Sequence, residues 1–238
     1  MKAIVYRTTG APSVLELVDR EVPEPGPAEV RVRIAVSGVN PTDWKSRVGG
    51  GPGQELPFPE VTPNQDGAGT VDAIGAEAAD LAPLLEVGDP VWTFLSQHQR
   101  PTGTAQEYVV LPVEHVVALP TGVSLDVGAS LGVPAMTAHR ALTVSEQGPS
   151  RLSPGALAGK VVLVAGGAGA VGHAAIQLAR WAGATVITTI SSDAKATLAT
   201  AAGAHHVVNY RTGDAVAEIK AVAPHGVDIV VEVAPGPN

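Results

Sequence analysis

The chain has 238 residues, of which 45% are apolar and 16% are charged. That balance is typical of a globular protein with a buried core, in one large or two small domains. The net charge of −8 and the aromatic content of 3% argue against nucleic-acid binding as a primary role. The absence of cysteine excludes disulfides, thiol nucleophiles and thiolate metal sites.

The sequence also bears on location. No apolar run approaches the roughly 18 residues needed to span a bilayer, and the start of the chain lacks the apolar core of a signal peptide. These features predict a cytoplasmic protein without a membrane partner.

The first half of the chain predicts a domain rich in strands. Short runs of β-branched and other apolar residues alternate with turns rich in proline and glycine. The predicted strands are residues 2–6, 29–37, 69–74, 90–94, 105–111 and 116–119. This spacing indicates a barrel-like first domain over residues 1–125. One helix-like stretch follows at 127–142, and then a linker at 148–155.

From Lys160 onward, apolar strands alternate with amphipathic helices. The predicted strands are residues 161–165, 185–190, 207–210 and 227–233. The helices between them include 193–202, with Gly203 in the position that follows a helix end, and 214–222. The alternation predicts an α/β domain with a parallel, doubly wound sheet, and we assign it residues 126–238.

The predicted series stops after its fourth strand. A six-stranded dinucleotide fold in the order 3-2-1-4-5-6 needs two more strands. The fourth strand would then be an apolar, uncovered edge, which natural proteins avoid. We therefore expect that the sheet is truncated after its fourth strand, or that an unusual partner covers that edge.

A glycine motif stands at the first strand of this second domain. Gly167, Gly169 and Gly172 form G-x-G-x-x-G directly after a predicted strand and at the start of a helix. Glycine permits the tight turn, the close approach of a pyrophosphate and the packing of helix on strand, and the helix N-terminus supplies free N–H groups. We predict that this turn, including Ala170 and Val171, binds a dinucleotide. The alternative is a merely structural turn.

The end of the second strand of this domain indicates which dinucleotide. An acidic residue there would accept a hydrogen bond from the ribose of NAD, but the chain has Ser191 and Ser192. Asp193 comes later, where a negative charge favours the start of a helix. Lys195 is suited to pair with a 2′-phosphate, which favours NADPH. The alternative is that Ser192 caps a helix and Lys195 is a solvated surface lysine.

Two other chemistries have weaker support. The seven histidines show no spacing typical of catalytic zinc. Residues 128–132 match the G-x-S-x-G pattern of an esterase, with Ser130 as the nucleophile. That pattern needs a strand before the serine, and residues 123–127 lack strand character. We therefore interpret Ser130 as a small residue packed in a helix.

Blocks along almost the whole chain resemble the medium-chain dehydrogenase/reductase superfamily. They are residues 38–43, 66–69, 87–91, 103–108, 132–142 and 165–172. More specifically, the sequence resembles the zinc-independent quinone oxidoreductase branch, which includes zeta-crystallin. The resemblance implies a GroES-like first domain and an NADP-binding Rossmann second domain. By analogy it also implies a homodimer.

The resemblance further implies site residues. Zinc alcohol dehydrogenases of the superfamily have a ligand cysteine where this chain has Asn40, and Gly-His-Glu where it has residues 64–66. In the quinone-reductase branch the asparagine and the residues after it line the cleft beside the nicotinamide. This makes Asn40, Asp43 and Arg47 candidates here. Lys45 departs from the branch, which often has tyrosine at that place.

The cofactor positions follow in the same way. Thr137 matches a threonine that approaches the nicotinamide, and Ser192, Lys195 and Tyr210 match positions that hold the adenosine 2′-phosphate. The candidate cofactor-binding residues are therefore Asn40, Thr137, Gly167, Gly169, Ala170, Val171, Gly172, Ser191, Ser192, Lys195 and Tyr210. The candidate catalytic residues are Asn40, Asp43, Lys45, Arg47 and Thr137, and no residue is assigned to a metal.

The predicted function is an NADPH-dependent reductase that transfers hydride to a quinone or an α,β-unsaturated carbonyl without zinc. Asn40, Lys45 and Arg47 are the polar groups available to the negative charge that develops on the substrate oxygen. Solvent would supply the proton. Two alternatives stay open: a non-catalytic NADPH-binding or structural protein of the crystallin kind, and an enoyl reductase that acts on thioesters.

Overall fold

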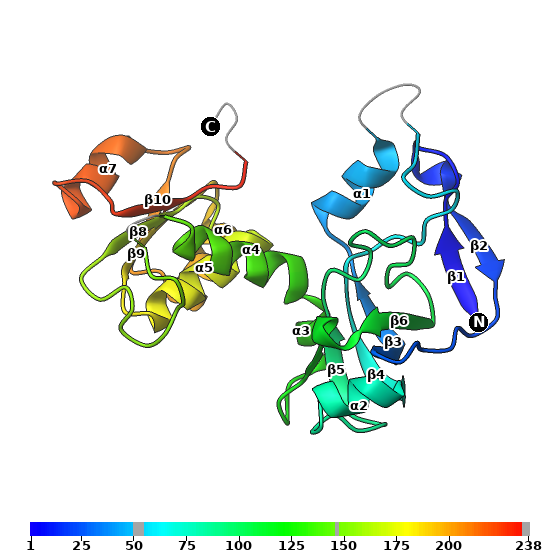
Figure 1. The fold of residues 1–238 in the computed structure, drawn as a ribbon. Helices are drawn as coiled ribbons and strands as arrows, with labels where there is room; N and C mark the ends of the chain where they lie inside the picture. Colours follow the sequence, from blue (N-terminus) through cyan, green and yellow to red (C-terminus); the bar gives the residue numbers. More distant parts are fainter. Residues whose placement is uncertain (50–54, 146–147, 235–238) are drawn as a thin grey trace. The chain divides into compact units, whose positions relative to one another are not determined.

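A computed structural model of the chain describes residues 1–49, 55–145 and 148–234. The chain divides into two compact units, Met1–Val133 and Pro134–Asn238 (Figure 1). The domain boundary predicted after residue 125 precedes this division by one short helix, α3 (Leu125–Ala129).

An antiparallel sheet of five strands is the framework of the first unit, in the order β6-β3-β4-β5-β7. Its strands are β3 (Glu29–Gly38), β4 (Asp66–Ile74), β5 (Pro90–Thr93), β6 (Tyr108–Pro112) and β7 (Val116–Ala118). Stiff β-branched side chains suit this pleated surface. The buried core over one face includes Val30, Val32, Val71, Val91 and Val109. The prediction of a strand-rich first domain is confirmed.

Shorter elements surround this sheet. A hairpin of β1 (Lys2–Val5) and β2 (Glu16–Asp19) pairs antiparallel, and a bridge between Ala3 and Gln106 joins it to the segment before β6. The sequence did not predict β2, because its side chains are largely exposed and show no alternation of apolar and polar residues. The remaining elements are η1 (Pro12–Val14), α1 (Pro41–Val48), α2 (Ala76–Leu81) and η2 (Val113–His115).

The single helix predicted over residues 127–142 is wrong, because the segment forms α3 and then α4 (Gly132–Thr143). The break occurs where the chain passes against β4. A Cβ on Gly132 would lie 2.1 Å from Asp66 Oδ1, and the Val133 amide donates to Asp66 Oδ2 over 2.8 Å. In one unbroken helix that amide would instead bond to the carbonyl four residues earlier.

The break also corrects the interpretation of Ser130. The side chain is exposed at the C-cap of α3, and its hydroxyl donates to the Val127 carbonyl over 2.7 Å. Ser130 is therefore not packed inside a helix. Residues 119–124 before α3 contain no strand, so the esterase pattern lacks the strand-to-helix turn that it requires.

A parallel sheet of four strands forms the second unit, in the order β10-β9-β8-β11. Its elements are β8 (Val161–Val164), α5 (Ala170–Trp181), β9 (Thr185–Ile190), α6 (Asp193–Ala201), β10 (His206–Asn209), α7 (Ala215–Val222) and β11 (Ile229–Val231). The second and third strands lie on one side of the first, and the fourth lies on the other. This is the predicted doubly wound arrangement.

Helices cover both faces of the parallel sheet. On one face α4, α5 and α6 pack in a core that includes Val162 and Val164 of β8. On the other face α7 packs in a core that includes Val161 and Leu163. Successive side chains of a strand point to opposite faces, which explains the continuous apolar run of β8.

Among the residues that the structure describes, no helix combines the length and the apolar character needed to cross a membrane.

Candidate dinucleotide and catalytic site

The glycine-rich turn joins β8 to α5. A Cβ on Gly167 would lie 2.1 Å from Thr188 Oγ1, and a Cβ on Gly172 would lie 2.3 Å from the Gly166 carbonyl oxygen. Both glycines are buried, so the packing of the turn itself requires them. Gly169 differs because it is exposed, and an added Cβ would meet only the Gly166 oxygen, at 3.3 Å. Because Gly169 is exposed and has no Cβ, a ligand can approach the backbone closely at this position.

The start of α5 supplies hydrogen-bond donors beside that opening. Gly169 is the N-cap, and Ala170, Val171 and Gly172 are the first residues of the helix. The first amides of a helix have no acceptor within it, and they carry the positive end of the helix dipole. The turn can therefore hold a pyrophosphate without any charged side chain.

A polar cluster lies where β9 and β10 end. Parallel pairing places Asn209 opposite Ile190, so the residues after both strands are neighbours. Lys195 Nζ donates to Ser191 Oγ over 2.8 Å. A hydrogen bond with Ser191 lowers the pKa of the Tyr210 hydroxyl, and Arg211 and Lys195 add to that effect. Two cations and two hydroxyls thus gather at one point.

Arg211 is the member of this cluster that sequence reasoning missed. Its signal was its place directly after Tyr210, at the end of the third strand of the parallel sheet. Ser192 was expected either to contact phosphate or to cap a helix. It occupies the N-cap position of α6, and its side chain makes no capping hydrogen bond in the described structure.

In the first unit, three predicted residues lie on α1. The Asn40 N–H donates to Asp43 Oδ2 over 2.6 Å, which forms a capping box at the start of the helix. Asp43 and Arg47 are four residues apart and share its buried face, whereas Lys45 is exposed. No helix was predicted here, although asparagine, Pro41 and an acidic residue at the third position are a helix-start signal.

Arg47 and Lys45 have different surroundings. Arg47 is buried and its guanidinium donates to the Gly10 carbonyl, so it ties α1 to the segment after β1. Lys45 Nζ lies 5.7 Å from the centroid of the Trp44 ring. Of the two cations, Lys45 is therefore the one whose charged group is exposed. Thr137 lies on α4 in the second unit and is half-buried.

Asp66, the first residue of β4, lies beside Asn40 and was absent from the predicted set. It is 1% exposed, and its Oδ2 accepts from Asn40 Nδ2 over 2.7 Å and from the Val133 amide. Burial, with a smaller contribution from the charge of Asp43, raises the pKa of Asp66 to about 6 against these hydrogen bonds. Burial also raises the pKa of Asp43, although the amides of Asn40 and Gln65 lower it. Sequence reasoning noted Asp66 only as a replaced metal ligand.

In residues 1–49, 55–145 and 148–234, no three histidine, aspartate or glutamate side chains gather so as to hold an ion.

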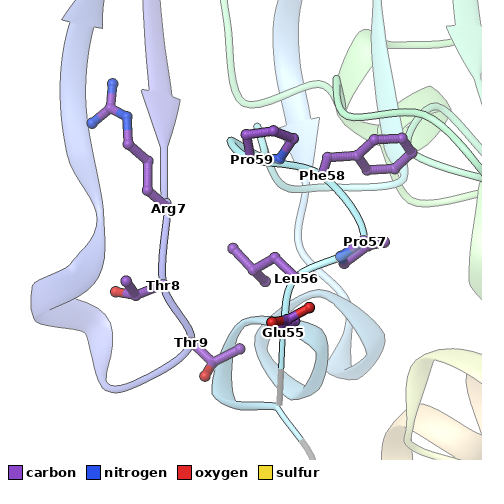
Figure 2. A pocket seen from close by; sticks show the side chains of 8 residues that line it. All are labelled: Arg7, Thr8, Thr9, Glu55, Leu56, Pro57, Phe58 and Pro59. Carbon is purple, nitrogen blue, oxygen red and sulfur yellow. The ribbon is translucent and has the colours of Figure 1, made fainter. Parts of the chain in front are cut away.

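A pocket of about 470 Å³ lies elsewhere in the first unit. Figure 2 shows its two walls, with Thr8 and Thr9 on one side and Leu56 and Pro57 on the other. Arg7 at its edge is paired with Glu16 over 2.6 Å. None of the predicted site residues lines it, so its size alone assigns it no role in the chemistry.

Comparisons with known proteins identify the family. Residues 26–121 match the alcohol dehydrogenase GroES-like domain, and residues 170–238 match the zinc-binding dehydrogenase family. Human quinone oxidoreductase is 33% identical over 98% of this chain and 66% of its own length. The rat quinone oxidoreductase is 32% identical over 100% of this chain and 68% of its own length. The mycobacterial protein Rv1454c, solved in complex with NADPH, is 32% identical with a TM-score of 0.77, over 97% of this chain and 66% of its own.

The chain belongs to the medium-chain dehydrogenase/reductase superfamily, in its quinone oxidoreductase branch. The predicted family and the predicted fold class are therefore confirmed. The chain spans 66% of the length of the human relative, slightly less than two thirds.

Proposed function

We propose that this protein is an NADPH-dependent reductase that transfers hydride to a quinone or an α,β-unsaturated carbonyl, and that it does so without zinc. The observation that carries the proposal is the open side of Gly169 at the start of α5, with the cluster of Ser191, Lys195, Tyr210 and Arg211 at the next strand end.

The second unit supports the cofactor assignment. The amides at the start of α5 suit a pyrophosphate, and the cation pair Lys195 and Arg211 suits a 2′-phosphate. Such a positive cluster stands out in a chain with a net charge of −8. NADP thus fits the residues present better than NAD, and the NADPH complex of the mycobacterial relative agrees with this.

The first unit supports the reductase assignment. The bound nicotinamide would supply the hydride. Asn40 is held rigidly by Asp43 and Asp66, as a group that orients reactants must be. Its side-chain amide donates to Asp66 and also forms a hydrogen bond with Asp43, so both buried carboxylates fix its orientation. Lys45 is an exposed donor for developing negative charge, whereas Arg47 already bonds the Gly10 carbonyl.

Zinc independence is supported by the residues themselves. Asn40 and residues 64–66 stand where zinc enzymes of the superfamily have their ligands, and the chain contains no cysteine. The matched zinc-binding dehydrogenase segment is residues 170–238, which does not include those positions.

The test is a fluorescence titration of the 238-residue chain with NADPH and with NADH, followed by addition of an ortho-quinone. Lys195→Ala should weaken NADPH binding about 10-fold to 150-fold and leave NADH nearly unchanged, because only NADPH has the 2′-phosphate. Arg211→Ala should act in the same direction. Lys220→Ala, an exposed lysine on α7, is the control for loss of one positive charge.

The outcomes separate the alternatives. Equal loss for NADPH and NADH would remove the 2′-phosphate assignment. Selective binding without oxidation of NADPH by quinones, enones or enoyl thioesters would favour a binding role over catalysis. Oxidation by enoyl thioesters alone would favour the enoyl reductase.

A further inference from the structure

Asn40 lies between two buried carboxylates. Its backbone N–H donates to Asp43 Oδ2 and its side-chain Nδ2 donates to Asp66 Oδ2, over 2.6 and 2.7 Å. Asp43 and Asp66 are 4% and 1% exposed. Within the described residues, no lysine or arginine forms an ion pair with either of them. A buried carboxylate without a counter-ion is costly when it is charged, so a role for its charge has to be sought.

The two oxygens of Asp66 are not equivalent. Oδ2 accepts both hydrogen bonds, from Asn40 and from the Val133 amide. Oδ1 has no hydrogen-bond partner among the described residues, and it faces Gly132, where a Cβ would lie 2.1 Å away. A proton added to this carboxyl group is therefore held on Oδ1, while Oδ2 stays an acceptor. Glycine at 132 permits this close approach, because any other residue would place its Cβ against Oδ1.

We propose that Asp66 is a positioning residue, whose carboxylate fixes the orientation of the Asn40 carboxamide and whose hold weakens when Oδ1 takes up a proton. A carboxamide turned the other way would bring its own oxygen against Asp66 Oδ2, and neither atom could donate. A charged acceptor makes a hydrogen bond roughly twice as strong as a neutral one. Asp43 also holds Asn40, through the capping box, and the charge on Asp66 sets how strongly the second contact fixes the carboxamide.

The groups packed around Asp66 make this charge sensitive to pH. They are Asn40 and Asp43 of α1, Gly38 of β3, Thr104 before β6, Gly132 and the Val133 amide at the start of α4. Among these, Asp43 is the charged group, and its charge opposes ionisation of Asp66. Burial has the larger effect, and together they raise the pKa of Asp66 to about 6.

The inference deepens the proposed function and rests on it for one consequence only. That consequence is catalytic: the Asn40 side-chain amide keeps one orientation toward the reacting groups. The coupling between Asp66 and Asn40 is a property of the protein without cofactor. It can therefore be measured whether or not the chain reduces quinones.

The experiment is nuclear magnetic resonance of the Asn40 side-chain amide in the 238-residue chain without cofactor, from about pH 4.5 to about pH 8. Its signals are assigned by their loss in Asn40→Ala. We expect the hydrogen-bonded Nδ2 proton to move upfield as the pH falls, with a midpoint near pH 6. A signal that does not titrate near that pH would overturn the proposal.

Variants identify the titrating group. Asp66→Asn can place its NH₂ at the Oδ1 position and keep its oxygen at Oδ2, so it imitates the protonated acid. Its Asn40 signal should stay at the low-pH position throughout. Asp72→Asn, on the same strand but paired with Arg31, should titrate like the unaltered chain. A titration that persists in Asp66→Asn and disappears in Asp43→Asn would assign the effect to Asp43 and overturn the proposal.

Turnover supplies a second readout. Where NADPH oxidation is observed, Asp66→Asn should lower kcat about tenfold at pH 8 with little change in KM for NADPH, and should match the unaltered chain at low pH. A purely structural role of Asp66 would lower the fraction of folded protein without removing this pH dependence. An inactive chain with a titrating Asn40 signal would count against the proposed function and leave the inference standing.

Discussion

The two glycines at the start of α5 should respond differently to the same substitution. In Gly172→Ala, the new Cβ would lie 2.3 Å from the Gly166 carbonyl oxygen, 2.9 Å from its carbon and 3.0 Å from the Gly167 Cα. All three are backbone atoms, so no side-chain rotation relieves the contact. Overpacking of this kind costs about 1–3 kcal/mol, and the better helix propensity of alanine returns up to about 1 kcal/mol. We expect a net loss of about 1–2 kcal/mol.

In Gly169→Ala, by contrast, the added Cβ has one close neighbour, the Gly166 oxygen at 3.3 Å, and the residue has φ −79°. Alanine adopts this backbone conformation without strain, and its poorer capping at this position costs about 0.5–1 kcal/mol. The methyl group instead occupies the approach of a pyrophosphate. Binding of both NADPH and NADH should therefore weaken about tenfold or more, a loss of at least about 1.4 kcal/mol.

The assay is urea denaturation followed by fluorescence titration of each variant with both cofactors. Gln177→Ala, exposed on the same helix, is the control for a change that touches neither the turn nor the cofactor. Equal stability losses in Gly169→Ala and Gly172→Ala would refute the distinction between a ligand-facing and a structural glycine. Unchanged cofactor binding in Gly169→Ala would mean that no ligand approaches there.

Two further predictions concern stability. Because the pKa of Asp66 is raised to about 6, this group stabilises the folded chain fully below about pH 4 and loses that contribution as the pH rises through 6; a shift of about two units corresponds to about 3 kcal/mol. Urea denaturation of Asp66→Asn and the unaltered chain at both ends of this range should show the variant gaining about that much relative stability at pH 8, and parallel profiles would contradict the burial argument. Ile176→Ala, at a fully buried position of α5, should cost about 2–5 kcal/mol, and a loss below 1 kcal/mol in the same assay would mean that the core around α5 collapses into the space.

Several features could be predicted from the sequence because their causes are local. The alternation of apolar strands and amphipathic helices from Lys160 onward yields the parallel sheet, since each pattern needs only neighbouring residues to be recognised. The end of α6 follows from Gly203, which adopts φ +103°, a conformation that glycine reaches without strain. The glycine motif likewise marks the β8–α5 turn, because its requirements lie within six residues.

Other features were not predicted from the sequence. One of them has a local sequence signal, and another depends on how the strands pair. The capping box of Asn40 and Asp43 is a local signal for α1 that could have been recognised. Arg211 could have been suspected from its place beside Tyr210, but its effect on that hydroxyl depends on the pairing of β9 with β10.

The sequence by itself determined most of the strands, the helices α5, α6 and α7, the glycine turn and the family resemblance, since these depend on residue order over short spans. The tertiary structure alone decided the break between α3 and α4, the burial of Asp66 and its bonds to Asn40 and Val133. These groups lie 26 and 67 residues away from Asp66 in the chain. The reason is that burial and the choice of hydrogen-bond partner belong to the folded arrangement. No local pattern encodes which distant amide will reach a carboxylate, or how far water is excluded from it.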